Sequence, residues 1–241
     1  MWTHNGLSSC STHSSRWSVN PHTVPAVNWR IATTVLCLLL LPAGAGAQLV
    51  EGQDYIAIGP RPVEPGQRVE VIEFFYYGCR SCYLLEPVLR EWVGHRSAYI
   101  DFRLIPALRR AAWAPLSDLF FAFYSLDVLP RLHERVYFAI HEQGRRLSSR
   151  SEQIRWVSEQ GVDPVVFEAA LNDDATLIAT QQARDATVAY GVRVTPTIVV
   201  DGRYLTTGEM IGDASRVSQV LDQLLEMALA TRGASQSERT Q

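Results

Sequence analysis

The sequence has 241 residues, of which 22 are basic and 25 acidic, giving a formal net charge of −3. This balance provides no excess of positive charge that would attract nucleic acid or an anionic membrane surface. The length accommodates one domain, or one domain with an insertion.

The N-terminal residues 1–47 are predicted to be a polar lead followed by a signal peptide. Arg30 precedes an apolar run at 31–41, which suits the core of a signal peptide but is shorter than the roughly 20 residues that span a bilayer. Small residues end this segment at Ala47, so we expect cleavage before Gln48 and export to the periplasm. The alternative is an uncleaved N-terminal anchor.

Only two of the four cysteines are expected in the mature protein. Cys10 and Cys37 lie in the lead and the signal peptide, whereas Cys79 and Cys82 lie downstream of the expected cleavage site. Export places this remaining pair in an oxidising compartment.

The first part of the mature chain, residues 48–107, predicts strand, helix and strand in that order. After a short strand candidate near 55–58, residues 68–77 are β-branched, aromatic and nearly continuous, which is typical of a strand buried on both faces. Gly78 ends this strand, and apolar residues then recur at helical spacing up to a second strand at 98–107. The order favours a right-handed βαβ unit with parallel strands.

Residues 108–182 are predicted to form a helical insertion without strands. Ser151 is a candidate N-cap for its third helix, and Asp163, followed by Pro164, for its fourth. A longer helix is expected from about 175 to 190.

Residues 183–232 are predicted to complete the domain with two strands and a helix. Asp201 and Gly202 lie between two runs of β-forming residues, which is a strong hairpin signal. An amphipathic helix follows, and the polar tail 233–241 is expected to be disordered.

The segment Cys79-Arg80-Ser81-Cys82 allows three interpretations. A structural zinc ion needs four nitrogen or sulfur ligands, but the mature chain has no other cysteine and its three histidines form no second cluster. A structural disulfide across four residues would contribute only roughly 2 kcal/mol. The third interpretation is redox chemistry.

The position of the two cysteines favours redox chemistry. Cys79 is predicted at the start of a helix, where unpaired N–H groups and the positive end of the helix dipole stabilise a thiolate and lower the thiol pKa. Cys82 follows one turn later, close enough to displace a group bound to Cys79. Two cysteines that would make a weak structural link therefore make an effective redox pair.

Pro196 begins a predicted strand in the second part of the domain, where thioredoxin-fold proteins carry a cis proline beside the redox pair. A trans bond is the ordinary expectation, since only about 5% of X–Pro bonds are cis. The context favours cis here. A cis bond would bring the backbone of Thr195 beside the cysteines, where it could pair with an extended substrate segment.

Glu73 lies inside the strand that is predicted to be buried. Alternation places it on the same face as Val71 and Phe75, where an ionised carboxylate is costly. Either Glu73 reaches solvent at an edge of the sheet, or its pKa is raised and it transfers protons for Cys82. We favour proton transfer.

At the level of motifs, "EFFYYGCRSCYLLEP", "VTPTIVVDGRY" and the helical insertion resemble the DsbA family of exported thiol:disulfide oxidoreductases. The resemblance extends from about Tyr55 to Leu229. It implies an α/β protein with a thioredoxin-like fold (βαβ…ββα) and an all-helical insertion.

The resemblance also implies roles for individual residues. Cys79 matches the exposed nucleophilic cysteine of the family, Cys82 its buried partner and Glu73 its buried acid. Thr195 and Pro196 match the substrate-binding cis-proline loop. No metal or cofactor is implied.

Three residues depart from the family pattern. Arg80 and Ser81 replace the commoner Pro-His pair, and Thr195 stands where valine is common. The loss of the histidine removes a partner of the thiolate, so we expect a Cys79 pKa below 7 but above the value of about 3.5 known for DsbA.

The expected function is therefore that of an exported, monomeric enzyme that introduces disulfide bonds into reduced secreted proteins. By analogy with the family, a DsbB-type membrane protein would reoxidise it. A disulfide reductase or isomerase with the same fold is the nearest alternative. A peptide-binding or chaperone module with an incidental cysteine pair is the alternative from another class.

Overall fold

The computed structural model describes residues 47–60 and 68–239 of the chain. The predicted lead and signal peptide, up to residue 46, lie outside these residues. Within the described ranges, no helix is both long enough and apolar enough to cross a membrane.

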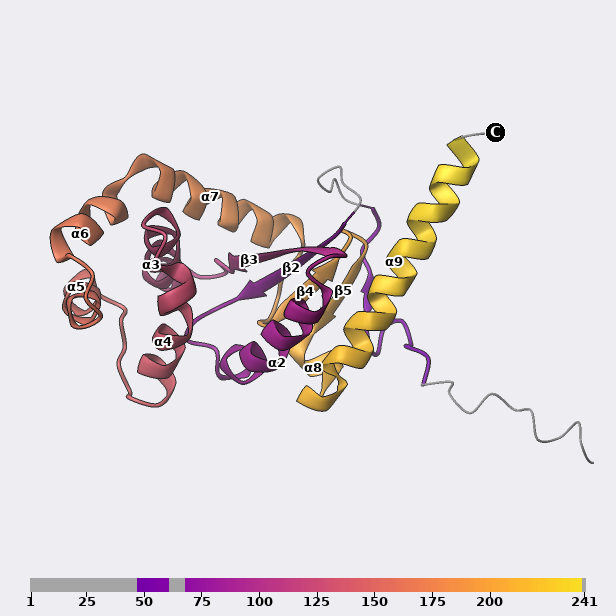
Figure 1. Ribbon diagram of the computed structural model, residues 1–241, viewed down its shortest axis with the longest axis horizontal. Coiled ribbons are helices and arrows are strands. Elements are labelled where there is room, and N and C mark those ends of the chain that lie inside the picture. The colour runs from indigo at the N-terminus through magenta and orange to yellow at the C-terminus, as the bar shows by residue number, and fades with distance from the viewer. Residues whose placement is uncertain (1–46, 61–67, 240–241) are drawn as a thin grey trace, which may run out of the picture. The chain divides into compact units, whose positions relative to one another are not determined.

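A five-stranded mixed sheet forms the centre of the fold (Figure 1). The strand order is β1-β5-β4-β2-β3, with β2 and β3 parallel and the other neighbours antiparallel. The strands are β1 (Ile56–Ala57), β2 (Val69–Phe75), β3 (Ile100–Pro106), β4 (Thr197–Val200) and β5 (Tyr204–Thr207).

The predicted βαβ unit and the predicted hairpin are both present. Helix α2 (Arg80–Arg96) connects β2 to β3, and every residue of β2 is buried. The β4–β5 turn contains Asp201 and Gly202 with φ angles of 56° and 60°, the left-handed conformation that a tight hairpin turn requires.

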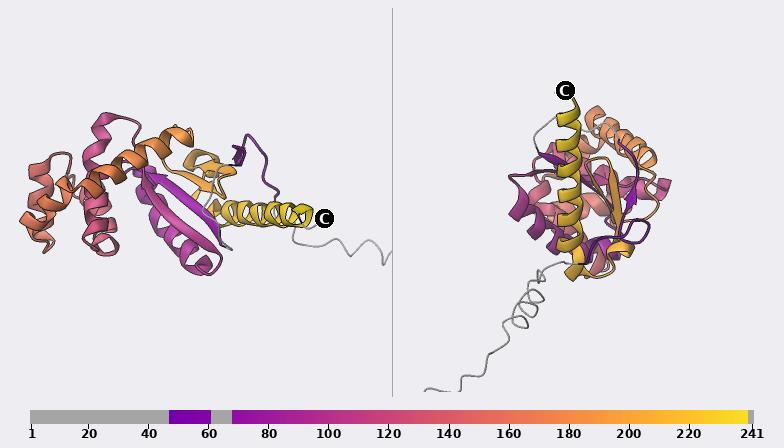
Figure 2. Two further views of the ribbon diagram at one scale, coloured as in Figure 1. Left: turned by 90° about the horizontal axis from the view of Figure 1, so that it is seen from above. Right: turned by 90° about the vertical axis from the view of Figure 1, so that its right-hand side faces the viewer.

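Each face of the sheet is covered by different elements. Val71 on β2 packs with residues of α2 and of the last helix, α9 (Val217–Arg239), among them Leu221. On the opposite face, Ile72 and Phe74 pack near Ala186 of helix α7 (Asp174–Ala189). Two further views show these layers from above and from the side (Figure 2).

The helical insertion forms one group beyond one end of the sheet, and α7 returns from that group to the sheet (Figure 1). Since α7 spans residues 182 and 183, one continuous helix crosses the boundary expected at that point. The other elements of the helical insertion are η2 (Ala111–Trp113), α3 (Ala114–Ser125), α4 (Leu129–His141), α5 (Arg150–Glu159) and α6 (Pro164–Asn172).

One of the two predicted caps in the insertion is confirmed and the other is wrong. Asp163 caps α6 by accepting from the N–H of Val165 at 2.8 Å. Helix α5, however, is capped by Ser149 instead of Ser151. Ser149 is placed three residues before Glu152, so that each side chain can accept from the other residue's backbone N–H in a capping box.

The C-terminal segment also differs from the expectation. Residues 233–239, predicted to be disordered, continue α9, which ends at Arg239. No proline follows Gly233, and alanine, glutamine, glutamate and arginine in this segment are good helix formers, so the packed helix can propagate through it. Two short elements, α8 (Gly208–Ile211) and η3 (Ala214–Arg216), precede α9.

Candidate active site at the start of helix α2

Gly78 brings the chain from β2 into α2 at a point where a side chain would not fit. A Cβ atom at this position would lie 2.5 Å from the ring of Tyr76, which itself stacks on Trp113 at 4.1 Å. The backbone N–H of Cys79 donates to the carbonyl of Tyr76 at 2.9 Å, which closes the turn. Cys79 is therefore the N-cap of α2.

Cys79 is a free thiol, partly exposed, and its pKa is lowered from 9.0 to about 6. The largest cause is a hydrogen bond from the Cys82 thiol, opposed by burial and assisted by the Thr195 side chain and by the backbone N–H groups of Cys82 and Ser81. The N–H of Cys82 lies 3.3 Å from Cys79 Sγ. A pKa of about 6 lies within the expected range, below 7 and above about 3.5, although its largest cause is the Cys82 thiol.

Cys82 has the opposite environment. It is fully buried, and burial, the hydrogen bond to Cys79 and the charge of Glu73 raise its pKa well above the ordinary value. At neutral pH Cys82 is therefore a protonated thiol, and its S–H can donate to the Cys79 thiolate. The two cysteines have opposite ionisation although one helical turn separates them.

The predicted cis bond between Thr195 and Pro196 is confirmed. This loop lies against the redox pair, since the Thr195 carbonyl oxygen is 3.2 Å from Cys79 Sγ. The carbonyl accepts a hydrogen bond only from the protonated thiol, so it opposes the effect of the Thr195 side chain on the thiolate.

Glu73 is buried in the interior of the sheet, between Leu104 of β3 and Ile198 of β4, with 1% of its surface exposed. The alternative that it reaches solvent at an edge is therefore wrong. Among the described residues, neither carboxylate oxygen has a hydrogen-bond partner. Burial, and then the charges of Glu86 and Cys79, raise the pKa of Glu73 well above its ordinary value.

Three residues near this site were not predicted as site residues. Glu86, Tyr77 and His133 are buried together: Tyr77 Oη lies 2.8 Å from His133 Nδ1, and His133 Nε2 lies 3.5 Å from Glu86 Oε2. Glu86 lies one helical turn after Cys82, a spacing that signals a shared buried face. His133 comes from α4 in the insertion, and no local pattern connects it with the cysteines.

A groove of about 300 Å³ lies beside the cysteine pair. Ser81 and Leu84 of α2 line one side and Pro196 another, with Ile211 and Val217 among the remaining lining residues. Leu84 is 56% exposed. The groove therefore presents apolar side chains beside Ser81, which lies between the two cysteines, and beside Pro196, which follows Thr195.

Comparison with known proteins gives consistent results. Residues 100–225 match the protein family described as a DSBA-like thioredoxin domain. The chain is 33% identical over 203 residues to the thiol:disulfide interchange protein DsbA of Burkholderia cepacia, covering 82% of this chain and 96% of that protein. It is 30% identical over 176 residues to the DsbA of Pseudomonas aeruginosa strain PAO1, covering 73% of this chain and 83% of that protein.

Solved structures show the same relationship. The crystal structure of Pseudomonas aeruginosa DsbA matches with a TM-score of 0.71 at 30% identity, covering 76% of this chain and 95% of that one. The oxidoreductase DsbA from Xylella fastidiosa matches with a TM-score of 0.69 at 31% identity, covering 76% and 98%. The chain therefore belongs to the DsbA family and has its thioredoxin-like fold with a helical insertion.

Proposed function

We propose that this protein is an exported thiol:disulfide oxidoreductase that introduces disulfide bonds into reduced secreted proteins through Cys79 and Cys82. The observation that carries the proposal is the opposite ionisation of the two thiols, one a thiolate at neutral pH and partly exposed, the other protonated and buried. A stabilised thiolate in the reduced enzyme makes the corresponding disulfide a stronger oxidant.

In the proposed reaction a substrate thiolate attacks Cys79 Sγ of the Cys79–Cys82 disulfide, and Cys82 leaves as a thiolate. A second substrate thiolate then attacks the substrate sulfur of the mixed disulfide and releases Cys79. Two electrons pass from the substrate dithiol to the enzyme. The substrate becomes a disulfide and the enzyme a dithiol.

We assign Glu73 the proton transfer that accompanies this exchange. The leaving Cys82 sulfur is buried and must gain a proton, and the buried Glu73, whose pKa is raised, is a proton donor near it. The unpaired carboxylate oxygens of Glu73 support this role, since no described contact fixes the proton elsewhere.

Substrate is proposed to bind as an extended segment across Thr195 and Pro196. The carbonyl of Thr195, beside Cys79, can accept from a substrate backbone N–H. The adjacent apolar groove would take side chains of an unfolded protein. The scaffold for these sites is the thioredoxin-like domain formed by residues 48–107 and 183–232, with the insertion at 108–182.

Export to the periplasm, with cleavage near Ala47 and Gln48, belongs to the same proposal. So does reoxidation by a DsbB-type membrane protein, since each turnover leaves a reduced enzyme. The mature protein is proposed to act as a monomer.

The experiment that tests the assignment compares two variants. Cys82→Ser is expected to accumulate mixed disulfides when it is incubated with substrate proteins that contain a disulfide, because the Cys79 thiolate attacks that disulfide and the neighbouring Cys82 thiol that would displace the bound substrate is absent. Cys79→Ser is expected to trap few, because the remaining thiol is buried. Non-reducing gel electrophoresis followed by mass spectrometry locates the bond. Equal trapping by both variants would contradict the assignment.

A reductase is the second candidate, and the departures at Arg80, Ser81 and Thr195 are the observation that favours it. We expect the reduction potential to lie between about −270 mV, as for thioredoxin, and about −120 mV, as for DsbA. Equilibration against glutathione measures it. A value near that of thioredoxin would replace the oxidase with the reductase.

A further inference from the structure

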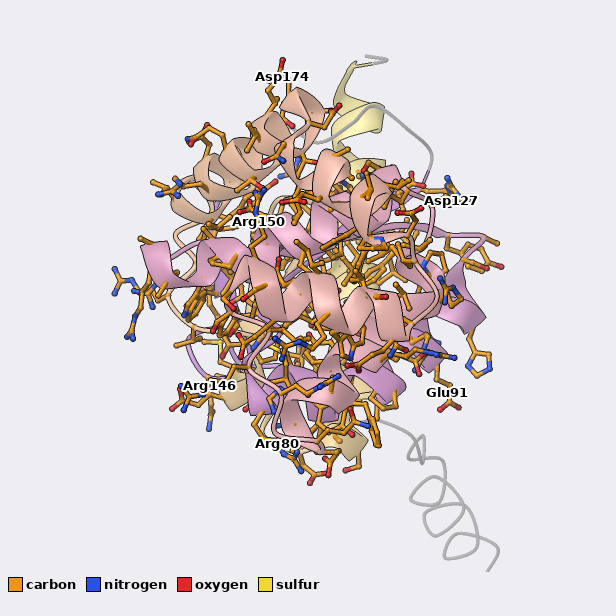
Figure 3. The ribbon with its side chains drawn as sticks, turned by 90° about the vertical axis from the view of Figure 1, so that its left-hand side faces the viewer. Arg80, Glu91, Asp127, Arg146, Arg150 and Asp174 are labelled. Atoms are coloured by element: carbon orange, nitrogen blue, oxygen red, sulfur yellow. The ribbon has the colours of Figure 1, made fainter. Side chains whose placement is uncertain are left out.

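The side chain of Arg80, the first residue between the two cysteines, is held by the helical insertion. Arg80 Nη1 donates to Glu142 Oε1 at 2.8 Å. Glu142 is the C-cap of α4, whereas Arg80 is the first residue of α2. In Figure 3, which looks onto the insertion, Arg80 lies at the lower edge of that face.

Two aromatic contacts fix the direction of this side chain. The Arg80 guanidinium lies 5.1 Å from the centre of the Tyr83 ring, and Tyr83 stacks on His141 with ring centres 5.1 Å apart. His141 Nε2 lies 2.8 Å from the carbonyl oxygen of Tyr77. Tyr83 is one turn further along α2, so Arg80 extends toward the body of the helix and the end of α4.

Because the Arg80 side chain extends toward α4, the Cys79 thiolate receives no positive charge from the segment between the two cysteines. The groups that lower the pKa of Cys79 are neutral hydrogen-bond donors from Cys82, Thr195 and Ser81. Arg80, adjacent in sequence, carries a permanent positive charge, but Glu142 neutralises it on the side of the insertion.

We propose that Glu142 sets the redox poise of the cysteine pair by holding the charge of Arg80 away from Cys79. Glu142 is thus a positioning residue that acts through Arg80 and touches neither cysteine. The inference rests on the proposed oxidase function and specifies how the insertion regulates that site.

The proposal predicts a change in redox behaviour with little change in folding. The Arg80 and Glu142 side chains are 54% and 40% exposed, and exposed ion pairs contribute little to stability. Without its carboxylate partner, Arg80 becomes an uncompensated positive charge beside the helix N-terminus. We expect Glu142→Gln to lower the Cys79 pKa by about half a unit.

A fall of about half a pKa unit corresponds to a change of about threefold in the equilibrium constant with glutathione. For a two-electron couple this is a potential about 15 mV more oxidising. The thiolate absorbance measured against pH gives the pKa, and a glutathione redox titration of the same protein gives the potential.

The decisive experiment is a double-mutant cycle with Arg80→Gln. If Glu142 acts through Arg80, Glu142→Gln shifts the Cys79 pKa in the protein that keeps Arg80. The same substitution causes no shift in the protein that also carries Arg80→Gln. Glu159→Gln is the matched control, because Glu159 pairs with Arg145 at a similar exposure of 45% in the insertion. It is expected to leave the Cys79 pKa and the potential unchanged.

Three outcomes would overturn the inference: an unchanged pKa in Glu142→Gln, an equal shift in both Arg80 backgrounds, or an equal shift in the Glu159 control. None of them depends on turnover, since each is read from the thiolate itself. Failure of Cys82→Ser to trap mixed disulfides in a protein that keeps Arg80 and Glu142 would instead contradict the proposed function, so the two failures are distinguishable.

Discussion

Two carboxyl groups are buried in the same sheet, Asp201 at the β4–β5 turn and Glu73 in the middle of β2, with 2% and 1% of their surfaces exposed. Asp201 receives hydrogen bonds from two arginines: Arg232 Nε donates at 2.9 Å and Arg203 Nε at 3.3 Å. Glu73 has no such partner among the described residues. Equal burial thus accompanies very different polar environments.

Two of the other buried acids follow the pattern of Asp201, whereas Glu86 lies beside His133 instead of an arginine. Glu70, on the same strand as Glu73, pairs with Arg103 at 2.9 Å, and Asp54 pairs with Arg216 at 2.7 Å. Burying an unpaired carboxylate costs free energy that an arginine partner offsets. The fold supplies an arginine to Asp201, Glu70 and Asp54, and Glu73, which we propose to transfer protons, is left without one.

The largest expected effect comes from breaking the paired acid. Asp201→Ala removes both arginine contacts and places alanine at a φ of 56°, so we expect a loss of about 3 kcal/mol in the free energy of unfolding. Asp201→Asn tolerates this backbone conformation and is expected to lose about half as much. Urea denaturation measures both. An alanine variant as stable as the wild type would remove the contrast with Glu73.

The unpaired acid should respond in the opposite direction. Glu73→Leu removes a desolvation cost, so we expect a gain of about 2 kcal/mol in stability at neutral pH, together with slower disulfide exchange. Glu70→Leu is the matched control on the same strand. Because it breaks the contact with the largely exposed Arg103, it should lose up to about 1 kcal/mol. A destabilised Glu73→Leu variant would show that the carboxyl group supports the fold.

The pH dependence of stability sharpens the comparison. Since burial raises the pKa of Glu73 above 4.5, the folded state keeps a proton that the unfolded state releases. Stability therefore falls as pH rises above that value, by up to about 1.4 kcal/mol per pH unit until the folded-state pKa is reached. Glu73→Leu removes this slope, so its advantage should widen from about pH 4 upward. A constant difference would contradict the raised pKa.

The smallest effect is expected at Asp54, where the pH dependence of stability has the opposite sign to that of Glu73. The hydrogen bond from Arg216, then one from the N–H of Val50, lowers the pKa of Asp54 below 3.8. Its ionised form stabilises the fold above that value, and this contribution is lost as pH falls through the lowered pKa. Asp54→Asn should cost less than about 1 kcal/mol at neutral pH and progressively less in acid. A stability cost of Asp54→Asn that grows as the pH falls would contradict the lowered pKa of Asp54.

Local sequence patterns predicted most of the scaffold and part of the site. The glycine before Cys79 and the helical spacing after it located the start of α2, alternation placed Glu73 inside the sheet, and Asp201-Gly202 marked the hairpin. Each of these features depends on residues that are close together in the sequence, where backbone preference and burial operate directly.

The partners that come from the insertion could not be predicted in this way. His133 and Glu142 reach the site from α4, and no spacing rule relates that helix to the cysteines. Their contacts depend on how the insertion packs on the end of β2 and the start of α2, where Phe75 and Cys82 share a core cluster with insertion residues. The Ser149 cap was missed by two residues, since Ser151 offers the same hydroxyl.

Strand β2 obtains its two neighbours from very different distances along the chain: Val71 pairs with Phe102 in β3 and with Val200 in β4. The second pairing closes a loop roughly four times longer, which costs about 1.2 kcal/mol more in chain entropy. We therefore expect β2, α2 and β3 to assemble early during folding, and β4 to join them after the insertion helices have formed. Until then Cys79 has its neighbours in α2 but lacks Thr195, so a newly made chain carries an active cysteine pair before the substrate-binding loop is in place.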